Sequence, residues 1–308
     1  GSTLSMPGRP SSCSDRNRRN VLWSAIDFAV FPAAMLIATP VLVCNLGIEQ
    51  FGVYVLMNSF VGFSLVFNFG FGDTILKYVS HYNARGGRRR SAQIVRLVGM
   101  LALWTGLIIG ILLILASSVI AGIFNIESLA YAKPALHLVA IIAPLKMLES
   151  VYVATLRGMY RYDLCGLVTT TSKVVTAGSH AGLAILAYQL PVLLAVSAVL
   201  SGISTLVLFG ISCRMLGNLA PRFSMRLFNR VKRFSAWSWV QGIAGIMYIS
   251  LDRLVIAALL GPSALGVYGV CVQISQNAHN AFAALSHTLF PRISSINSSR
   301  PVETGGNS

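Results

Sequence analysis

The residues best suited to chemistry are charged side chains that lie inside long apolar segments. Lys146 and Glu149 are three positions apart in one such segment, and Lys173 lies in the next. A charge inside a bilayer is costly, so each of these residues is by default a functional candidate. Two lysines near one carboxylate leave a net positive charge, which would attract an anion such as a phosphate group in a water-filled cavity. The alternative is a Lys–Glu pair that ties two helices together while the other lysine extends toward the membrane surface.

A second group of candidates lies further along the chain. The planar guanidinium of Arg253 could bind phosphate, or it could form a salt bridge between helices. Its neighbour Asp252 would point about 100° away on a helix, so the two need not pair. Gln273, Asn277 and Asn280 fall on one stripe of a helix, where amides could bind sugar hydroxyls or contact other helices.

Three carboxylates are candidates for ion or proton coupling, namely Asp27, Glu149 and Asp252. A carboxylate that is removed from water binds a proton more readily and can therefore cycle protons. Asp27 could instead pair with Arg16 or Arg19. No cysteine or histidine has metal-ligand spacing and no glycine motif could cradle a phosphate, so we predict neither a catalytic residue nor a cofactor.

The elements that position these residues are predicted to be membrane helices. The chain has 308 residues, of which 55% are hydrophobic and 11% charged. Soluble domains average about 45–50% apolar and 25% charged residues, so a soluble enzyme, a nucleic-acid module and a disordered scaffold are poor interpretations. The sequence predicts an all-α, polytopic bundle with eight spans of about 20 or more residues each. The expected spans are 21–46, 51–76, 96–124, 135–156, 164–188, 191–213, 235–260 and 265–290.

The charges of the connections predict the topology. Twenty of the 24 lysines and arginines lie in the two terminal tails and in alternate connections, and Lys133 lies in the other set. Because cytoplasmic loops carry excess positive charge, both termini are expected in the cytoplasm. The net charge of +15 thus indicates topology and not nucleic-acid binding. Residues 217–233 are expected to form an amphipathic helix on the inner leaflet, or to recognise an anionic lipid headgroup.

The first two spans recur near the end of the chain at a shift of 214 residues. The shift crosses six spans, so both copies begin at the same membrane face. This is a parallel repeat about an axis along the membrane normal, an arrangement that secondary transporters use. The identities are Trp23-Ser24 with Trp237-Ser238, Leu46-Gly47 with Leu260-Gly261, and Gly52-Val53-Tyr54 with Gly266-Val267-Tyr268.

The repeated residues have predictable roles in a tight hairpin. We expect the first glycine of each copy to end a helix in a left-handed cap, and the second to let two backbones approach closely. We expect the tyrosines to lie at the membrane interface. The pairs are Gly47 and Gly261, Gly52 and Gly266, and Tyr54 and Tyr268.

Three stretches carry a family resemblance: residues 46–54 (LGIEQFGVY), residues 67–74 (FNFGFGDT), and Asp252-Arg253-Leu254 with the repeated turn that follows. They resemble the polysaccharide transporters (O-antigen flippases, Wzx-type) of the multidrug/oligosaccharidyl-lipid/polysaccharide exporter superfamily. The resemblance implies twelve spans in two six-helix lobes and alternating access through a central cavity. It also implies translocation of an undecaprenyl-pyrophosphate-linked oligosaccharide, with no enzymatic activity. Since only eight spans are expected here, the sequence resembles a family member that lacks its C-terminal part.

The expected organisation follows from the repeat and the resemblance. It comprises a basic cytoplasmic tail (1–19), a six-helix lobe (20–213), an amphipathic linker (214–234), two helices of a second lobe (235–290) and a cytoplasmic tail (291–308). The expected partners are a lipid-linked oligosaccharide, membrane lipids, and polysaccharide polymerase or chain-length machinery, without nucleic acid. A multidrug or small-solute exporter and a non-transporting fragment are the alternatives. A glycan polymerase or glycosyltransferase would need larger loops and paired acids outside the spans.

Overall fold

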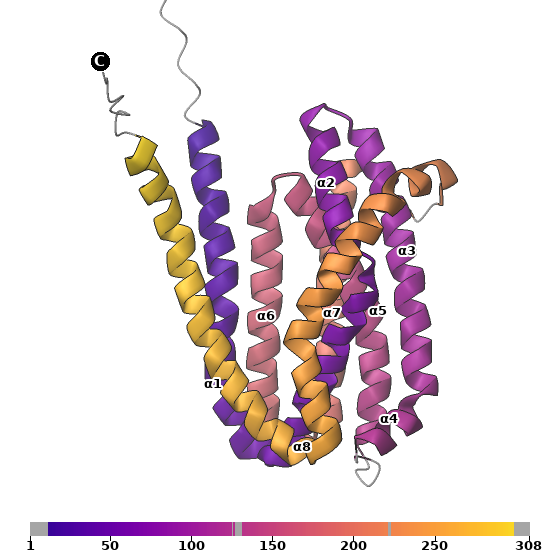
Figure 1. The fold of residues 1–308 in the computed structure, drawn as a ribbon, viewed down its shortest axis with the longest axis vertical. Coiled ribbons are helices and arrows are strands. Elements are labelled where there is room, and N and C mark those ends of the chain that lie inside the picture. Colours follow the sequence, from indigo (N-terminus) through magenta and orange to yellow (C-terminus); the bar gives the residue numbers. More distant parts are fainter. Residues whose placement is uncertain (1–11, 125, 127–130, 221–222, 299–308) are drawn as a thin grey trace, which may run out of the picture.

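The protein is all-α throughout the part that the computed structural model describes. The described backbone covers residues 12–124, 126, 131–220 and 223–298, and the described side chains cover 34–35, 37–124, 126, 131–220, 223–245, 247 and 250–276. The elements are α1 (Ser12–Ser64), the 3-10 helix η1 (Leu65–Asn68), α2 (Phe71–Ala84), α3 (Arg88–Leu115), α4 (Ser117–Ile123), α5 (Ala132–Gly158), α6 (Tyr162–Ile185), α7 (Leu190–Leu216) and α8 (Met225–Ser298). Figure 1 shows them as one bundle of long helices.

Several helices are long and apolar enough to cross a membrane. On α3, Trp104, Ile111 and Leu115 leave 56%, 56% and 75% of their surfaces exposed, as expected of a lipid-facing helix. The prediction of an all-α bundle with membrane helices is confirmed, while the count of eight spans stays a prediction. Within the described residues the five candidate spans are Ile37–Asn68, Arg88–Leu115, Ala132–Gly158, Leu190–Leu216 and Ser250–Gln276.

Two predicted spans are interrupted in the structure. The second (51–76) breaks at Phe69 and Gly70, whose φ values are +44° and +64°. A Cβ atom at Gly70 would lie 2.8 Å from the carbonyl oxygen of Ser235 in α8, so a glycine is needed at this break. The third (96–124) divides at Ala116 into α3 and the short α4. The predicted spans run across both breaks because they are based on the mean hydropathy of long segments, although Asn68, Gly70 and Asp73 interrupt the first hydrophobic run and Ser117-Ser118 the second.

The two long helices bend at the repeated glycines. In α1 Gly47 has φ 79° and ψ 161°, and in α8 Gly261 has φ 80° and ψ 179°. These matching angles, 214 residues apart, belong to a region that is essentially open to glycine alone. Each glycine has the positive φ of the predicted left-handed cap but not its ψ. The predicted cap is therefore wrong, and each glycine instead makes a sharp bend. Both bends lie at the same end of the bundle, which we call the hairpin end (Figure 1).

The two bends pack on each other through a second pair of repeated glycines. A Cβ atom at Gly52 would overlap the carbonyl oxygen of Pro262, and one at Gly266 would overlap the carbonyl oxygen of Ile48. Residues 48 and 262 are themselves 214 apart, so the contact is reciprocal. The predicted close approach of two backbones is confirmed, and it joins the two copies of the repeat.

The opposite end of the bundle carries the basic connections, and we call it the basic end. It contains the α2–α3 turn with Arg85 and Arg88–Arg90, together with the start of α8 (Figure 1). α8 begins at Met225 and runs without a break to the bend at Gly261, so the basic segment before residue 235 is continuous with the helix that follows. The gathering of these arginines at one end of the bundle supports the predicted topology. The orientation of the protein in the cell stays a prediction.

A buried polar group links three helices near the hairpin end. Tyr54 of α1 and Nδ1 of His180 of α6 are 3.1 Å apart, and Nε2 of His180 lies 2.8 Å from Ser197 Oγ of α7. Tyr54 is 8% exposed and therefore faces the bundle core and not lipid, while its predicted depth at the membrane interface stays a prediction. The hydroxyl has a partner inside the core, which offsets the cost of burying it.

Candidate functional site

Lys146 and Glu149 form an ion pair on α5. Their spacing of three predicted one helix face, and the structure places Lys146 Nζ 2.7 Å from Glu149 Oε2. The lysine side chain is 36% exposed and the glutamate 13%, so the ammonium group is open to a ligand or to water. The pair lies within a single helix and therefore does not tie two helices together.

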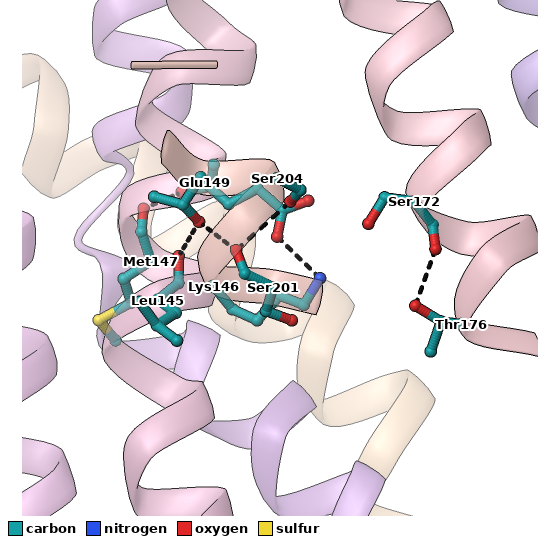
Figure 2. A network of polar contacts seen from close by, with 10 residues as sticks. Leu145, Lys146, Met147, Glu149, Ser172, Thr176, Ser201 and Ser204 are labelled. Atoms are coloured by element: carbon teal, nitrogen blue, oxygen red, sulfur yellow. Dashed lines mark hydrogen bonds and ion pairs between the residues drawn. The ribbon is translucent and has the colours of Figure 1, made fainter. Parts of the chain in front are cut away.

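Hydroxyl groups lie beside this ion pair, and they are not among the predicted site residues. Figure 2 shows Ser201 and Ser204 of α7 close to Lys146 and Glu149. Thr205 donates to the carbonyl oxygens of Ser201, at 2.7 Å, and of Leu145 on α5, at 3.3 Å. The last bond joins α5 to α7 through a polar side chain. The spacing 201, 204, 205 is a helix-face pattern that could have indicated this strip.

The facing helix α6 brings further polar groups. The nitrogen of Lys146 points toward the side of α6 that carries Ser172 and Thr176 (Figure 2). Thr176 donates to the carbonyl oxygen of Ser172 at 2.7 Å. The predicted site residue Lys173 follows Ser172 directly and is half-buried. The run Thr169-Thr170-Thr171-Ser172 is the sequence signal for a polar helix here.

Arg253 and Asp252 lie on α8 and do not pair through their side chains. Asp252 accepts hydrogen bonds from the Tyr268 hydroxyl and from the backbone N–H of Arg253. Nε of Arg253 is buried and has no hydrogen-bond partner among the described residues. A buried donor without a partner is costly, which makes the guanidinium a candidate for binding an anion.

The remaining predicted site residues are described only in part. Gln273 lies on α8 and is half-buried. Asn277 and Asn280 lie on the same helix, and Asp27 lies on α1, but their side chains are outside the described residues. Their predicted roles stay predictions.

The structure brings some of the predicted residues together and keeps others apart. α5 packs on α7, and its polar pair faces the side of α6 that carries Ser172 and Thr176. α8 packs mainly on α1 and α2, so Arg253 belongs to a different part of the bundle. No group of three or more His, Cys, Asp or Glu residues in the described part could hold a metal ion.

The sequence matches a known family over most of its length. Residues 41–301 match the family described as polysaccharide biosynthesis protein. The chain belongs to this family. The match contains both repeated hairpins, the ion pair on α5 and Arg253, so the family resemblance found in the sequence is confirmed.

A curated relative gives the family match a more specific context. The chain is 21% identical over 280 residues to a Shigella flexneri protein named "Putative O-antigen transporter". The alignment covers 90% of this chain and 66% of that protein, so the chain spans slightly less than two thirds of the relative's length. No solved structure matches the chain.

Proposed function

We propose that this protein transports an undecaprenyl-pyrophosphate-linked oligosaccharide, such as an O-antigen or other surface-polysaccharide unit, across the bacterial inner membrane by alternating access. The observation that carries the proposal is the reciprocal packing of Gly52 and Gly266 between the two repeats. In many secondary transporters, two repeats move against each other as rigid bodies. Two parallel repeats that meet at one membrane face fit this arrangement. Family membership and the relative's name support the choice of substrate.

The electrostatics of the described helices suit an anionic substrate. Glu149 neutralises Lys146, so this ion pair carries no net charge, and Arg253 is the predicted cationic residue with an unpartnered donor among the described residues. The unpartnered Nε of Arg253 is a donor for a phosphate oxygen. The hydroxyls of α6 and α7 offer donors and acceptors to sugars on the other side of the bundle.

The carboxylates are the proposed residues for coupling transport to an ion or proton. Glu149 is the best placed of the predicted ion-coupling residues, because protonating it would release the ammonium of Lys146 for a pyrophosphate. Asp252 is held by Tyr268 and is the second candidate. Asp27 stays a third candidate from its position in the sequence. The expected partners are membrane lipids and the polymerase or chain-length machinery that receives the exported unit.

Surface display of polysaccharide tests the proposal. Arg253→Ala, and separately Lys146→Ala with Lys173→Ala, should reduce display by tenfold or more in cells that depend on this protein. The matched control is Lys133→Ala, which removes an exposed lysine at the start of α5 and should leave display unchanged. Membrane fractions must contain equal amounts of each variant. Normal display with both Arg253→Ala and the double variant would contradict the proposal.

A further inference from the structure

A basic cavity at the basic end of the bundle lies outside the transport site described above. It has a volume of about 610 Å³ and lies between α2 and the first part of α8. Lys77 and Tyr78 of α2 form one wall. The other wall is a single face of α8, made of Arg230, Arg233, Phe234, Ala236, Trp237 and Val240.

The cavity changes in character along α8. Arg230 and Arg233 come first, and Trp237 and Val240 follow one to three turns later on the same face. At 1.5 Å per residue, the distance from Arg230 to Val240 is about 15 Å. A cationic end that leads into an aromatic and apolar end matches a molecule with a phosphate at one end and hydrocarbon at the other.

Among the described residues, no carboxylate forms an ion pair with the cations in this cavity. Lys77 Nζ lies 3.8 Å from the centre of the Phe234 ring, and Nη1 of Arg230 donates to the Tyr82 hydroxyl at 3.3 Å. Asp73 lies one turn before Lys77, but its carboxylate accepts a hydrogen bond from Ser238. Within the described chain neither arginine is within ion-pair distance of an acidic side chain. The site therefore retains positive charge for a ligand.

The structure also fixes the shape of the cavity. Tyr78 donates to the carbonyl oxygen of Arg230 at 3.2 Å, and Thr74 and Ser235 are joined at 2.6 Å. Both contacts hold α2 against α8 beside the cavity. Trp237 nevertheless leaves 74% of its surface exposed. An exposed tryptophan beside arginines is typical of a membrane–water interface.

From this geometry we propose that the cavity binds the phosphate headgroup of an anionic glycerophospholipid of the inner leaflet. Lys77, Arg230 and Arg233 contact the phosphate, and Trp237 with Val240 contacts the glycerol and the start of the acyl chains. The chemistry that the site recognises is a phosphate oxyanion attached to an apolar chain. Such a lipid would stabilise the packing of α2 on α8, and the site is independent of the transported substrate.

Native mass spectrometry of the purified protein with equimolar phosphatidylglycerol and phosphatidylcholine tests the site. The wild type should retain phosphatidylglycerol about tenfold more than phosphatidylcholine, because each nearby cation strengthens binding of an anionic lipid. The triple substitution Lys77→Gln, Arg230→Gln and Arg233→Gln should lower that retention about tenfold or more. Equal retention of the two lipids by the wild type would overturn the proposal.

Two further variants separate the site from general charge and from folding. The matched control Arg85→Gln, Arg88→Gln and Arg89→Gln removes three cations from the neighbouring α2–α3 turn and should leave retention within twofold. Ala236→Trp keeps every cation and fills the cavity at an exposed position, so it should lower retention about as much as the triple variant. An equal loss in the control, or no loss with Ala236→Trp, would overturn the proposal. Displacement of the lipid by equimolar inorganic phosphate would identify a site for a free ion and overturn the lipid assignment.

Discussion

Gly52 of α1 and Gly266 of α8 lie against each other, and the opposite hairpin leaves no room for a side chain at either glycine. Gly52→Ala and Gly266→Ala should each lower the free energy of unfolding by about 2 kcal/mol or more, because a methyl group would push the two backbones apart. Denaturation of the purified protein in detergent measures this change. Gly178→Ala on α6, where a Cβ atom would meet open space, is the matched control and should stay within about 1 kcal/mol of the wild type. A loss no larger at Gly52 than at Gly178 would contradict the reciprocal packing.

The bends at Gly47 and Gly261 give a second prediction. Both glycines have positive φ with extended ψ, so alanine at either position should cost about 1–3 kcal/mol through backbone strain alone. A Cβ atom at either glycine would meet no other atom, so steric contact cannot explain the loss. Because the two conformations match, the two losses should be similar. The same denaturation experiment measures them, and Gly72→Ala in α2 serves as the control. Unchanged stability in either variant would show that the bend does not require glycine.

The contact between Asp73 of α2 and Ser238 of α8 gives a third prediction. In a double-mutant cycle with Asp73→Asn and Ser238→Ala, the coupling free energy should be about 1.5–3 kcal/mol, as expected of a hydrogen bond to a charged group. A parallel cycle with Ser80→Ala should give no coupling, since Ser80 donates to the carbonyl oxygen of Lys77 in its own helix. Additive effects of Asp73→Asn and Ser238→Ala would mean that the two helices are not joined here.

The ion pair on α5 gives a fourth prediction, which separates stability from transport. Glu149→Gln alone should destabilise the protein by about 1–3 kcal/mol, because it leaves Lys146 uncompensated in the bundle. Lys146→Met with Glu149→Gln should recover most of that loss, yet polysaccharide display should remain low. Unfolding in detergent and display in cells measure the two effects on the same variants. Recovery of both together would assign the pair a structural role.

The long-range features that the sequence predicted are those that its repeat encodes. Gly47 and Gly261, and Gly52 and Gly266, could be paired because they recur at one shift, and the structure places all four at one end of the bundle. The ion pair between Lys146 and Glu149 was predictable because it is local, within one turn of a helix.

Features that depend on packing between helices were not predictable in the same way. Tyr54 was expected at the membrane interface, but its partner His180 lies 126 residues away and draws the hydroxyl into the core. The break at Gly70 is set by Ser235 of α8, a contact that no local pattern indicates. Ser201 and Thr205 are spaced as on one helix face within an apolar segment, which is a weak sequence signal. Their place in a candidate site follows only from the packing of α7 on α5 beside Lys146.

The transport of a lipid-linked oligosaccharide is the central claim, and its translocation in inverted membrane vesicles is the most direct test. The vesicles are loaded on the outer, formerly cytoplasmic leaflet with an undecaprenyl-pyrophosphate-linked oligosaccharide, and the fraction protected from an added glycosidase is followed over time. Vesicles with the wild-type protein should protect an increasing fraction, whereas vesicles without the protein or with Arg253→Ala should protect little. Equal protection in vesicles with the wild-type protein and in vesicles without it would contradict the account.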